Sequence, residues 1–154
     1  MNHNKKLEST LKSQAGSEAP VDSAWAETYA EGIALIENAL VVLSDLSRNR
    51  SYIYRGRFAK NFNLSEKSVE NTIWEEEILH LIPADDREKK YLYELKYFQF
   101  LQQIPTSQLR DYYLVNTLRM QTLSGKLINV LHRTYYLYAD DDRAIAFGLC
   151  IYQQ

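Results

Sequence analysis

The chain has 154 residues, of which 45% are hydrophobic and 25% charged, a composition typical of one globular domain. The net charge of −2 gives no overall attraction to nucleic acid or anionic lipid. The single cysteine, Cys150, excludes an intrachain disulfide and a multi-cysteine metal site. No apolar run reaches the length of a membrane span and the N-terminus is polar, so we expect a cytoplasmic protein without membrane contact.

The first part of the chain predicts a flexible segment over residues 1–22, with a weak helical stretch around Leu7 and Leu11. A flanking helix is expected over residues 23–38, with Asp22 or Ser23 as its N-cap, inside a domain that spans residues 23–154. Large apolar residues recur along this helix at helical spacing and form one stripe: Trp25, Tyr29, Ile33 and Ile36. We expect this stripe to support homodimerisation.

The middle of the chain predicts a hairpin followed by helices. Apolar residues at 40–43 and alternating residues at 52–54 are separated by a polar turn, which indicates two paired strands. A helical stretch is expected to begin near Ser65, with Glu75, Glu76 and Glu77 facing outward. Pro83 then ends it, and Asp85 with Glu88 forms a capping-box pattern that begins a long helix to about residue 103.

The last third of the sequence is typical of strands. Residues 111–122 alternate between apolar and polar, residues 127–138 are rich in Val, Thr and Tyr, and residues 144–152 form an apolar run. Ser124-Gly125 and the Asp140–Asp142 run are expected to form the two turns between them. Three long strands joined by short turns predict an antiparallel meander.

Four segments in this order resemble PAS domains. They are His80-Leu-Ile-Pro-Ala-Asp-Asp86, Leu118-Arg-Met-Gln-Thr-Leu-Ser-Gly125, Val130-Leu-His-Arg133 and Gly148-Leu-Cys-Ile-Tyr152. The chain is most similar to the PAS-like domain that precedes the helix-turn-helix of LuxR-type bacterial transcription regulators. The resemblance implies an α+β fold: a five-stranded antiparallel sheet with helices on one face, plus an N-terminal helix. It also implies that a DNA-binding domain would follow Gln154, so we expect a domain excised from a longer chain, which reaches DNA only through that absent domain.

The residues that could carry chemistry favour structural roles. Three consecutive glutamates fan around a helix and cannot all face one substrate, and Asp85 and Asp86 are explained by capping and the helix dipole. Haem-binding PAS domains carry a histidine on the long helix, where this sequence has none, and Cys150 lies outside the motif of flavin-binding light sensors. The basic and aromatic residues between Arg48 and Lys60 indicate a solvated edge. We therefore expect no catalytic residue, no metal and no cofactor.

The resemblance implies a ligand space between the inner sheet face and the long helix. Its expected lining consists of Trp74, Ile78, Leu95, Phe98, Leu118, Met120, His132 and Tyr135. These large side chains predict either a packed core or a small pocket for an apolar or aromatic molecule, held by tyrosine hydroxyls or His132.

Three functions follow from these observations. The leading one is a non-catalytic sensory and dimerisation domain of a bacterial transcriptional regulator. The alternatives are a stand-alone protein that binds a small ligand and, less favoured, a small enzyme of the cone-shaped isomerase type. The enzyme would need a His–Asp or similar pair inside a cavity, and the sequence has no obvious one.

Overall fold

The fold was taken from a computed structural model that describes residues 3–14, 22–139 and 143–154. Its helices are α1 (His3–Gln14), α2 (Ala24–Ile36), α3 (Glu76–Leu79) and α4 (Ala84–Leu101), with 3-10 turns η1 (Arg57–Asn61) and η2 (Thr106–Asp111). Its strands are β1 (Leu40–Asp45), β2 (Arg50–Arg55), β3 (Val69–Glu70), β4 (Leu114–Gln121), β5 (Leu127–Tyr138) and β6 (Ile145–Gln153). The predicted order of a helix, a hairpin, helices that end in a long one, and a meander is confirmed. The turn expected at residues 140–142 lies outside the described residues.

The strands form one antiparallel sheet in the order β3-β2-β1-β6-β5-β4. The sheet therefore has six strands, and the expected number of five is wrong. The additional strand, β3, is two residues long and pairs with Ser51 and Tyr52 at the edge of the hairpin. It occupies the stretch where a helix was expected from Ser65 onward, so helix α3 is confined to four residues before the break at Pro83.

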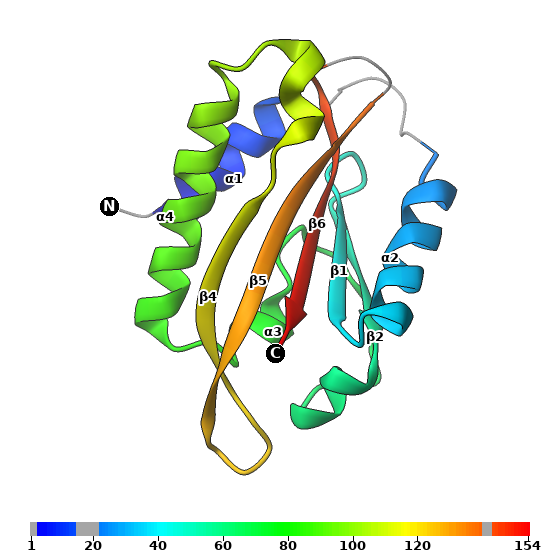
Figure 1. The fold of residues 1–154 in the computed structure, drawn as a ribbon, viewed down its shortest axis with the longest axis vertical. Helices are drawn as coiled ribbons and strands as arrows, with labels where there is room; N and C mark the ends of the chain where they lie inside the picture. The colour runs from blue at the N-terminus through cyan, green and yellow to red at the C-terminus, as the bar shows by residue number, and fades with distance from the viewer. Residues whose placement is uncertain (1–2, 15–21, 140–142) are drawn as a thin grey trace.

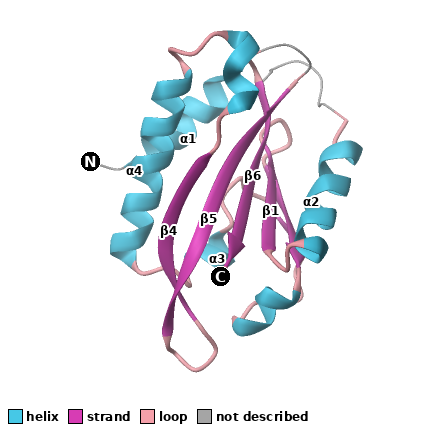
Figure 2. Ribbon diagram, viewed as in Figure 1, coloured by secondary structure: helices cyan, strands magenta, loops and turns pink. Residues whose placement is uncertain are grey.

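Helices cover the two faces of the sheet separately, as Figures 1 and 2 show. Helix α4, with α1 beside it, lies over the inner face, and α2 lies over the outer face. Strand β5 illustrates the alternation: His132, Thr134 and Tyr136 are buried on the inner face, and Tyr135 and Leu137 belong to the outer face. The α+β class and the separate N-terminal helix are as predicted. No described helix is long and apolar enough to span a membrane.

Helix α2 packs on the outer face through its small residues. Ala26, Ala30 and Ala34 recur every four residues and are buried against the sheet. Their small side chains let the helix lie close to the strands. The predicted apolar stripe therefore points largely away from the sheet: Tyr29 is 65% exposed and Ile36 is 86% exposed.

Helix α1 occupies part of the segment predicted to be flexible. The expected helical stretch around Leu7 and Leu11 is present, and both side chains are buried in a cluster with residues of α4 and β5. Packing against α4 supplies the burial that such a polar helix needs. Residues 15–21, where a linker was expected, lie outside the described residues.

Helix α4 begins two residues earlier than its charges suggested. Pro83 is the N-cap residue, so the capping box predicted for Asp85 and Glu88 is wrong. Asp86 lies in the first turn and accepts hydrogen bonds from the backbone N–H of Arg119 at 2.8 Å and from its guanidinium. This contact fixes the start of α4 to strand β4.

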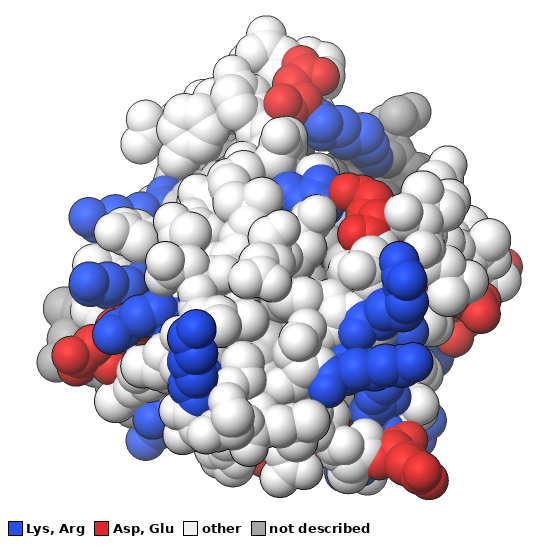
Figure 3. Space-filling model, turned by 60° about the horizontal axis from the view of Figure 1, so that its bottom comes forward, with Lys and Arg blue, Asp and Glu red and all other residues white. Residues whose placement is uncertain are grey.

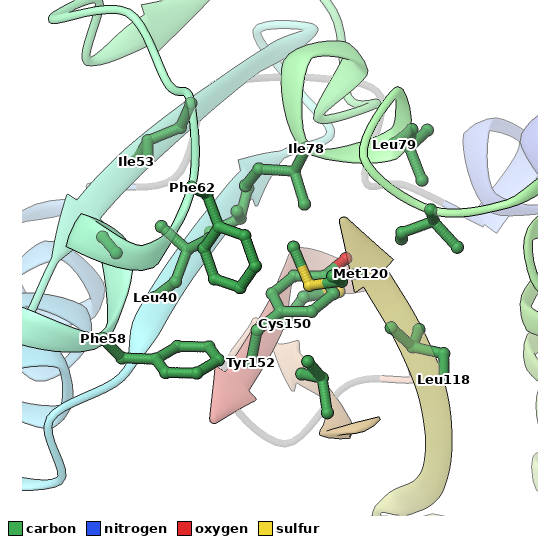
Figure 4. Close-up of a cluster of buried hydrophobic side chains, with 14 of the residues drawn as sticks. Leu40, Ile53, Phe58, Phe62, Ile78, Leu79, Leu118, Met120, Cys150 and Tyr152 are labelled. Carbon is green, nitrogen blue, oxygen red and sulfur yellow. The ribbon is translucent and has the colours of Figure 1, made fainter. Parts of the chain in front are cut away.

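The inner-face core is a dense cluster of apolar side chains from both halves of the chain. Figure 4 shows Met120, Cys150 and Tyr152 close together near its centre, with Phe58 and Phe62 of the η1 region beside them. The two phenylalanine rings meet edge to face at 5.1 Å. The cluster ends where α4 presents charged side chains to the sheet.

Candidate functional site: a buried polar cluster

Seven polar or ionisable side chains meet between α4 and the inner face of the sheet. We call them the buried polar cluster: Glu75, Lys90, Glu94, His132, Thr134, Cys150 and Tyr152. Each is at most 9% exposed. Lys90 and Glu94 come from one face of α4, the other members from β5, β6 and the segment before α3. Charged side chains are almost never fully buried unless they are paired, so this gathering requires explanation.

Lys90 is the cation of the cluster. Its Nζ lies 2.9 Å from Glu94 Oε1, one turn along α4, and 3.7 Å from Glu75 Oε1. Burial alone would lower the pKa of Lys90, but the two carboxylates outweigh it and raise the pKa above the ordinary value. Lys90 is therefore charged, while burial raises the pKa of Glu94 above its ordinary value.

Glu75 contradicts the expectation that all three glutamates face outward. It is 2% exposed, and its Oε1 accepts a 2.7 Å hydrogen bond from the Tyr152 hydroxyl. The reason is that α3 begins only after Glu75, which occupies its N-cap position. The backbone N–H groups of Glu76 and Glu77 bond instead to the carboxylate of Glu70.

His132 is buried completely in strand β5. Its Nδ1 lies 3.0 Å from the side-chain oxygen of Asn116, so Nδ1 carries the proton and donates. The other ring nitrogen, Nε2, is buried and has no hydrogen-bond partner. Burial, with a smaller contribution from Lys90, lowers the pKa of His132 well below its ordinary value. The ring is therefore neutral and presents a buried lone pair.

Cys150 lies on β6 beside these groups as a free thiol. Burial and the nearby Glu75 raise the pKa of Cys150 well above its ordinary value. One ligand atom from each of Glu94, His132 and Cys150 lies within 4.8 Å of the other two. These three residue types are all common metal ligands.

A cavity of about 40 Å³ adjoins the cluster. It is lined by Glu75, Lys90, Glu94, Thr134 and Cys150 together with apolar residues such as Trp74 and Leu11. This volume suits a water-sized molecule or an ion. It does not accommodate the apolar or aromatic ligand that the sequence suggested.

The eight residues predicted to line a pocket do not meet at one place. Ile78, Leu118 and Met120 are packed in one core cluster and Leu95 and Phe98 in another, with Trp74 partly buried between them. His132 joins the buried polar cluster. Tyr135 is on the opposite side of the sheet, where its ring stacks on Tyr113 at 4.7 Å, and its assignment to the pocket is wrong. The alternation of β5 places its neighbour Tyr136 inside instead.

The prediction missed Lys90, Glu94, Glu75 and Tyr152. A signal for the first two was present, since Lys90 and Glu94 are four residues apart on the same side of α4 as Phe98 and Leu101. Charged residues within an apolar stripe indicate a buried ion pair. Glu75 gave no such signal, because its burial depends on where α3 begins. His80, which lies just before α4, is exposed and outside the cluster.

The outer face carries a different candidate surface. A groove of about 330 Å³ runs between α2 and the sheet, lined by Trp25, Tyr29, Ile33, Tyr135, Leu149 and Ile151 among others. Arg133 lies at this groove and pairs with Glu37 at 2.8 Å. All four residues predicted for dimerisation line one of two adjoining hollows on this side of α2.

Lys and Arg side chains stand in separate groups around a broad uncharged area on the face that Figure 3 shows. Within the predicted solvated edge, Arg48 pairs with Asp45 at 2.7 Å, and the Arg55 guanidinium donates to the backbone carbonyls of Ser65 and Lys67. These arginines stabilise local turns.

No family model matches the chain, and no curated protein matches it. Among solved structures, it is similar to a sensory box histidine kinase/response regulator from Burkholderia thailandensis E264, at 14% identity and a TM-score of 0.45. That match covers 84% of this chain and 80% of the other. The element order and the antiparallel sheet show an α+β domain.

Proposed function

We propose that this chain is the sensory and dimerisation domain of a bacterial transcription regulator of the LuxR type. In this proposal it acts in the cytoplasm, has no catalytic activity, and passes a signal to a DNA-binding domain elsewhere in the same protein. The inner face, with its small polar cavity, receives the signal. The outer face, with α2, forms the contact with a second copy.

The observation that carries this proposal is the apolar groove between α2 and the outer face of the sheet. Trp25 and Tyr29, which line the groove, and Ile36, which lines the adjoining hollow on α2, are exposed to solvent. Contiguous exposed apolar surface of this kind marks interaction sites. Aromatic side chains contribute most of the energy at such sites, and the Arg133–Glu37 pair supplies the polar rim that interfaces commonly have.

A second copy of the chain is the favoured partner because each copy carries both halves of the contact on the same face: the apolar stripe of α2 and the groove between α2 and the sheet. The α2 stripe of one copy can enter the groove of the other, and the same contact is made twice in a two-fold dimer. Helix α2 connects to β1 through three residues, so a change in the sheet is transmitted directly to the dimer contact.

Size-exclusion chromatography with light scattering tests the proposal. We expect the chain to run as a dimer and the variants Tyr29→Asp and Ile36→Asp to run as monomers. Leu123→Asp is the matched control, because Leu123 is 65% exposed at the β4–β5 turn, away from the groove. The proposal is wrong if the unchanged chain is monomeric throughout the micromolar range, or if Leu123→Asp dissociates the dimer as fully as the α2 variants.

A further inference from the structure

We propose that the buried polar cluster binds one divalent transition-metal ion, of which zinc is the best match, through Glu94, His132 and Cys150. This inference goes beyond the sensory role proposed above and holds whether or not the chain dimerises. It names a divalent metal ion as the ligand bound between α4 and the inner face of the sheet. It also revises the sequence-based expectation that no metal is bound.

The donor set is the first support. A carboxylate oxygen, an imidazole nitrogen and a sulfur atom are all ligands of zinc, which takes them in tetrahedral geometry. Bond lengths of about 2.0–2.3 Å place tetrahedral ligands about 3.3–3.8 Å apart. The three donor atoms are already within 4.8 Å of one another, so shifts of about 1 Å close the site. The three residues are far apart in the sequence, and the fold brings their elements, α4, β5 and β6, together at this point.

The second support is the state of His132. A metal-binding histidine almost always donates its other ring N–H to an oxygen, which fixes the tautomer and the ring orientation. Asn116 provides that oxygen at 3.0 Å from Nδ1. Nε2 then carries a lone pair that is wholly buried and has no hydrogen-bond partner. An unpaired buried nitrogen costs free energy, and a bound ion removes that cost.

The third support is the buried carboxylates. Lys90 lies beside two of them, Glu75 and Glu94, in a fully buried place. A divalent ion that displaces the thiol proton of Cys150 to solvent adds one net positive charge beside these carboxylates. Glu94 has two carboxylate oxygens, so it can keep Lys90 on Oε1 and still ligate an ion. The adjoining cavity of about 40 Å³ is lined by Glu94 and Cys150 and has room for a water molecule beside the ion site.

Cobalt(II) is the probe, because its tetrahedral thiolate complexes have intense and distinctive absorbance. The untagged full chain is unfolded, refolded with a reductant and cobalt, and dialysed, since the site is too enclosed for rapid entry. We expect one cobalt per chain, a sulfur-to-cobalt charge-transfer band, displacement by zinc, and a raised Tm. The Cys150→Ala variant should lose the band, and Asn116→Ala should bind at least tenfold more weakly.

His80→Gln is the control, since it removes an exposed histidine outside the cluster and should leave binding unchanged. Circular dichroism of each metal-free variant establishes that it folds, and Asn116→Ala keeps the test decisive if the change at Cys150 prevents folding. Absence of bound metal in the unchanged chain would overturn the proposal. A band or Tm shift that persists in Cys150→Ala at unchanged affinity would also overturn it. The oligomeric state is read separately by light scattering, so failure of either proposal is distinguishable from failure of the other.

Discussion

The Tyr152 hydroxyl donates a 2.7 Å hydrogen bond to the Glu75 carboxylate, and both side chains are almost fully buried. The contact joins the last strand to the segment just before α3, 77 residues away in sequence. The hydroxyl gives the Glu75 carboxylate a hydrogen bond in addition to its ion pair with Lys90, whose Nζ lies 3.7 Å away. The two residues thereby connect the core of the sheet to the charged side of α4.

Removal of that hydroxyl should weaken the fold without disturbing the ring. The Tyr152→Phe variant is expected to lose about 1.5–3 kcal/mol of unfolding free energy, because a buried hydrogen bond to a charged group is lost. Urea denaturation measures the loss. Tyr113→Phe, which alters a half-exposed ring on the outer face, should change stability by less than about 0.5 kcal/mol. Equal effects of the two changes would contradict a special role for the Glu75 contact.

Lys90 should be far more important to stability than an exposed lysine of the same helix. The Lys90→Met variant leaves two buried carboxylates without their cation, and we expect it to cost about 3–5 kcal/mol. Lys96→Met, on the exposed side of α4, is the matched control and should fall within about 0.5 kcal/mol of the unchanged chain.

A second change checks the cause of that loss. Glu94→Gln in the Lys90→Met background removes one of the two unpaired charges, so part of the stability should return. Urea midpoints of the single and double variants give the comparison. If the double variant is less stable than Lys90→Met alone, the loss comes from packing of the lysine stem and not from buried charge.

The neutral, buried state of His132 predicts a pH dependence in the metal-free, chelator-treated protein. The folded pKa lies well below the unfolded value of 6.5, through burial first and Lys90 second. The unfolded chain therefore binds more protons below pH 6.5. The contribution of neutral His132 to the free energy of unfolding is complete above pH 6.5. It is lost as the pH falls toward the folded pKa, at up to about 1.4 kcal/mol per pH unit.

The groups that face the ring are Lys90, Glu94, Asn116, Cys150 and Tyr152. Lys90, Cys150 and Tyr152 keep their charge between pH 5 and 7.5, since their pKa values are raised above ordinary values that are already basic. Burial raises the pKa of Glu94 above its acidic ordinary value, so protonation of Glu94 contributes to the curve of the unchanged chain and of the histidine variant alike. Denaturant curves of the unchanged chain and of His132→Gln across this range isolate the histidine. Parallel stability curves would show that His132 is not held neutral.

Gly56 and Gly32 should respond in opposite ways to alanine. A Cβ at Gly56 would lie 2.8 Å from the backbone N and O of Ala39 and closer still to the carbonyl oxygen of Ala34. Backbone atoms cannot move aside, so Gly56→Ala should cost about 3 kcal/mol or more and loosen α2 from the sheet. A Cβ at Gly32, within α2, meets nothing within 4 Å, and Gly32→Ala should stabilise by about 0.4–1 kcal/mol. Thermal unfolding of both variants checks the pair.

The sequence by itself determined the order of elements and most of the strands. The alternation in residues 111–122 and 127–138 predicted β4 and β5 because a strand with one buried face repeats every two residues. It also predicted a helix over 23–38 with an apolar stripe suited to a partner. It did not indicate which face of that helix packs on the sheet, since both the alanines and the large apolar residues recur at helical spacing.

Only the tertiary structure decided the character of the interior. Glu75, Lys90 and Glu94 are charged residues that sequence patterns place at the surface, and their burial depends on partners from distant strands. The same holds for β3, whose two residues form a strand only because β2 offers them an edge. The periodicity of a short segment reflects only contacts between residues that are close in the sequence. The charge balance around His132 and Cys150 depends on three elements that meet only when the domain folds.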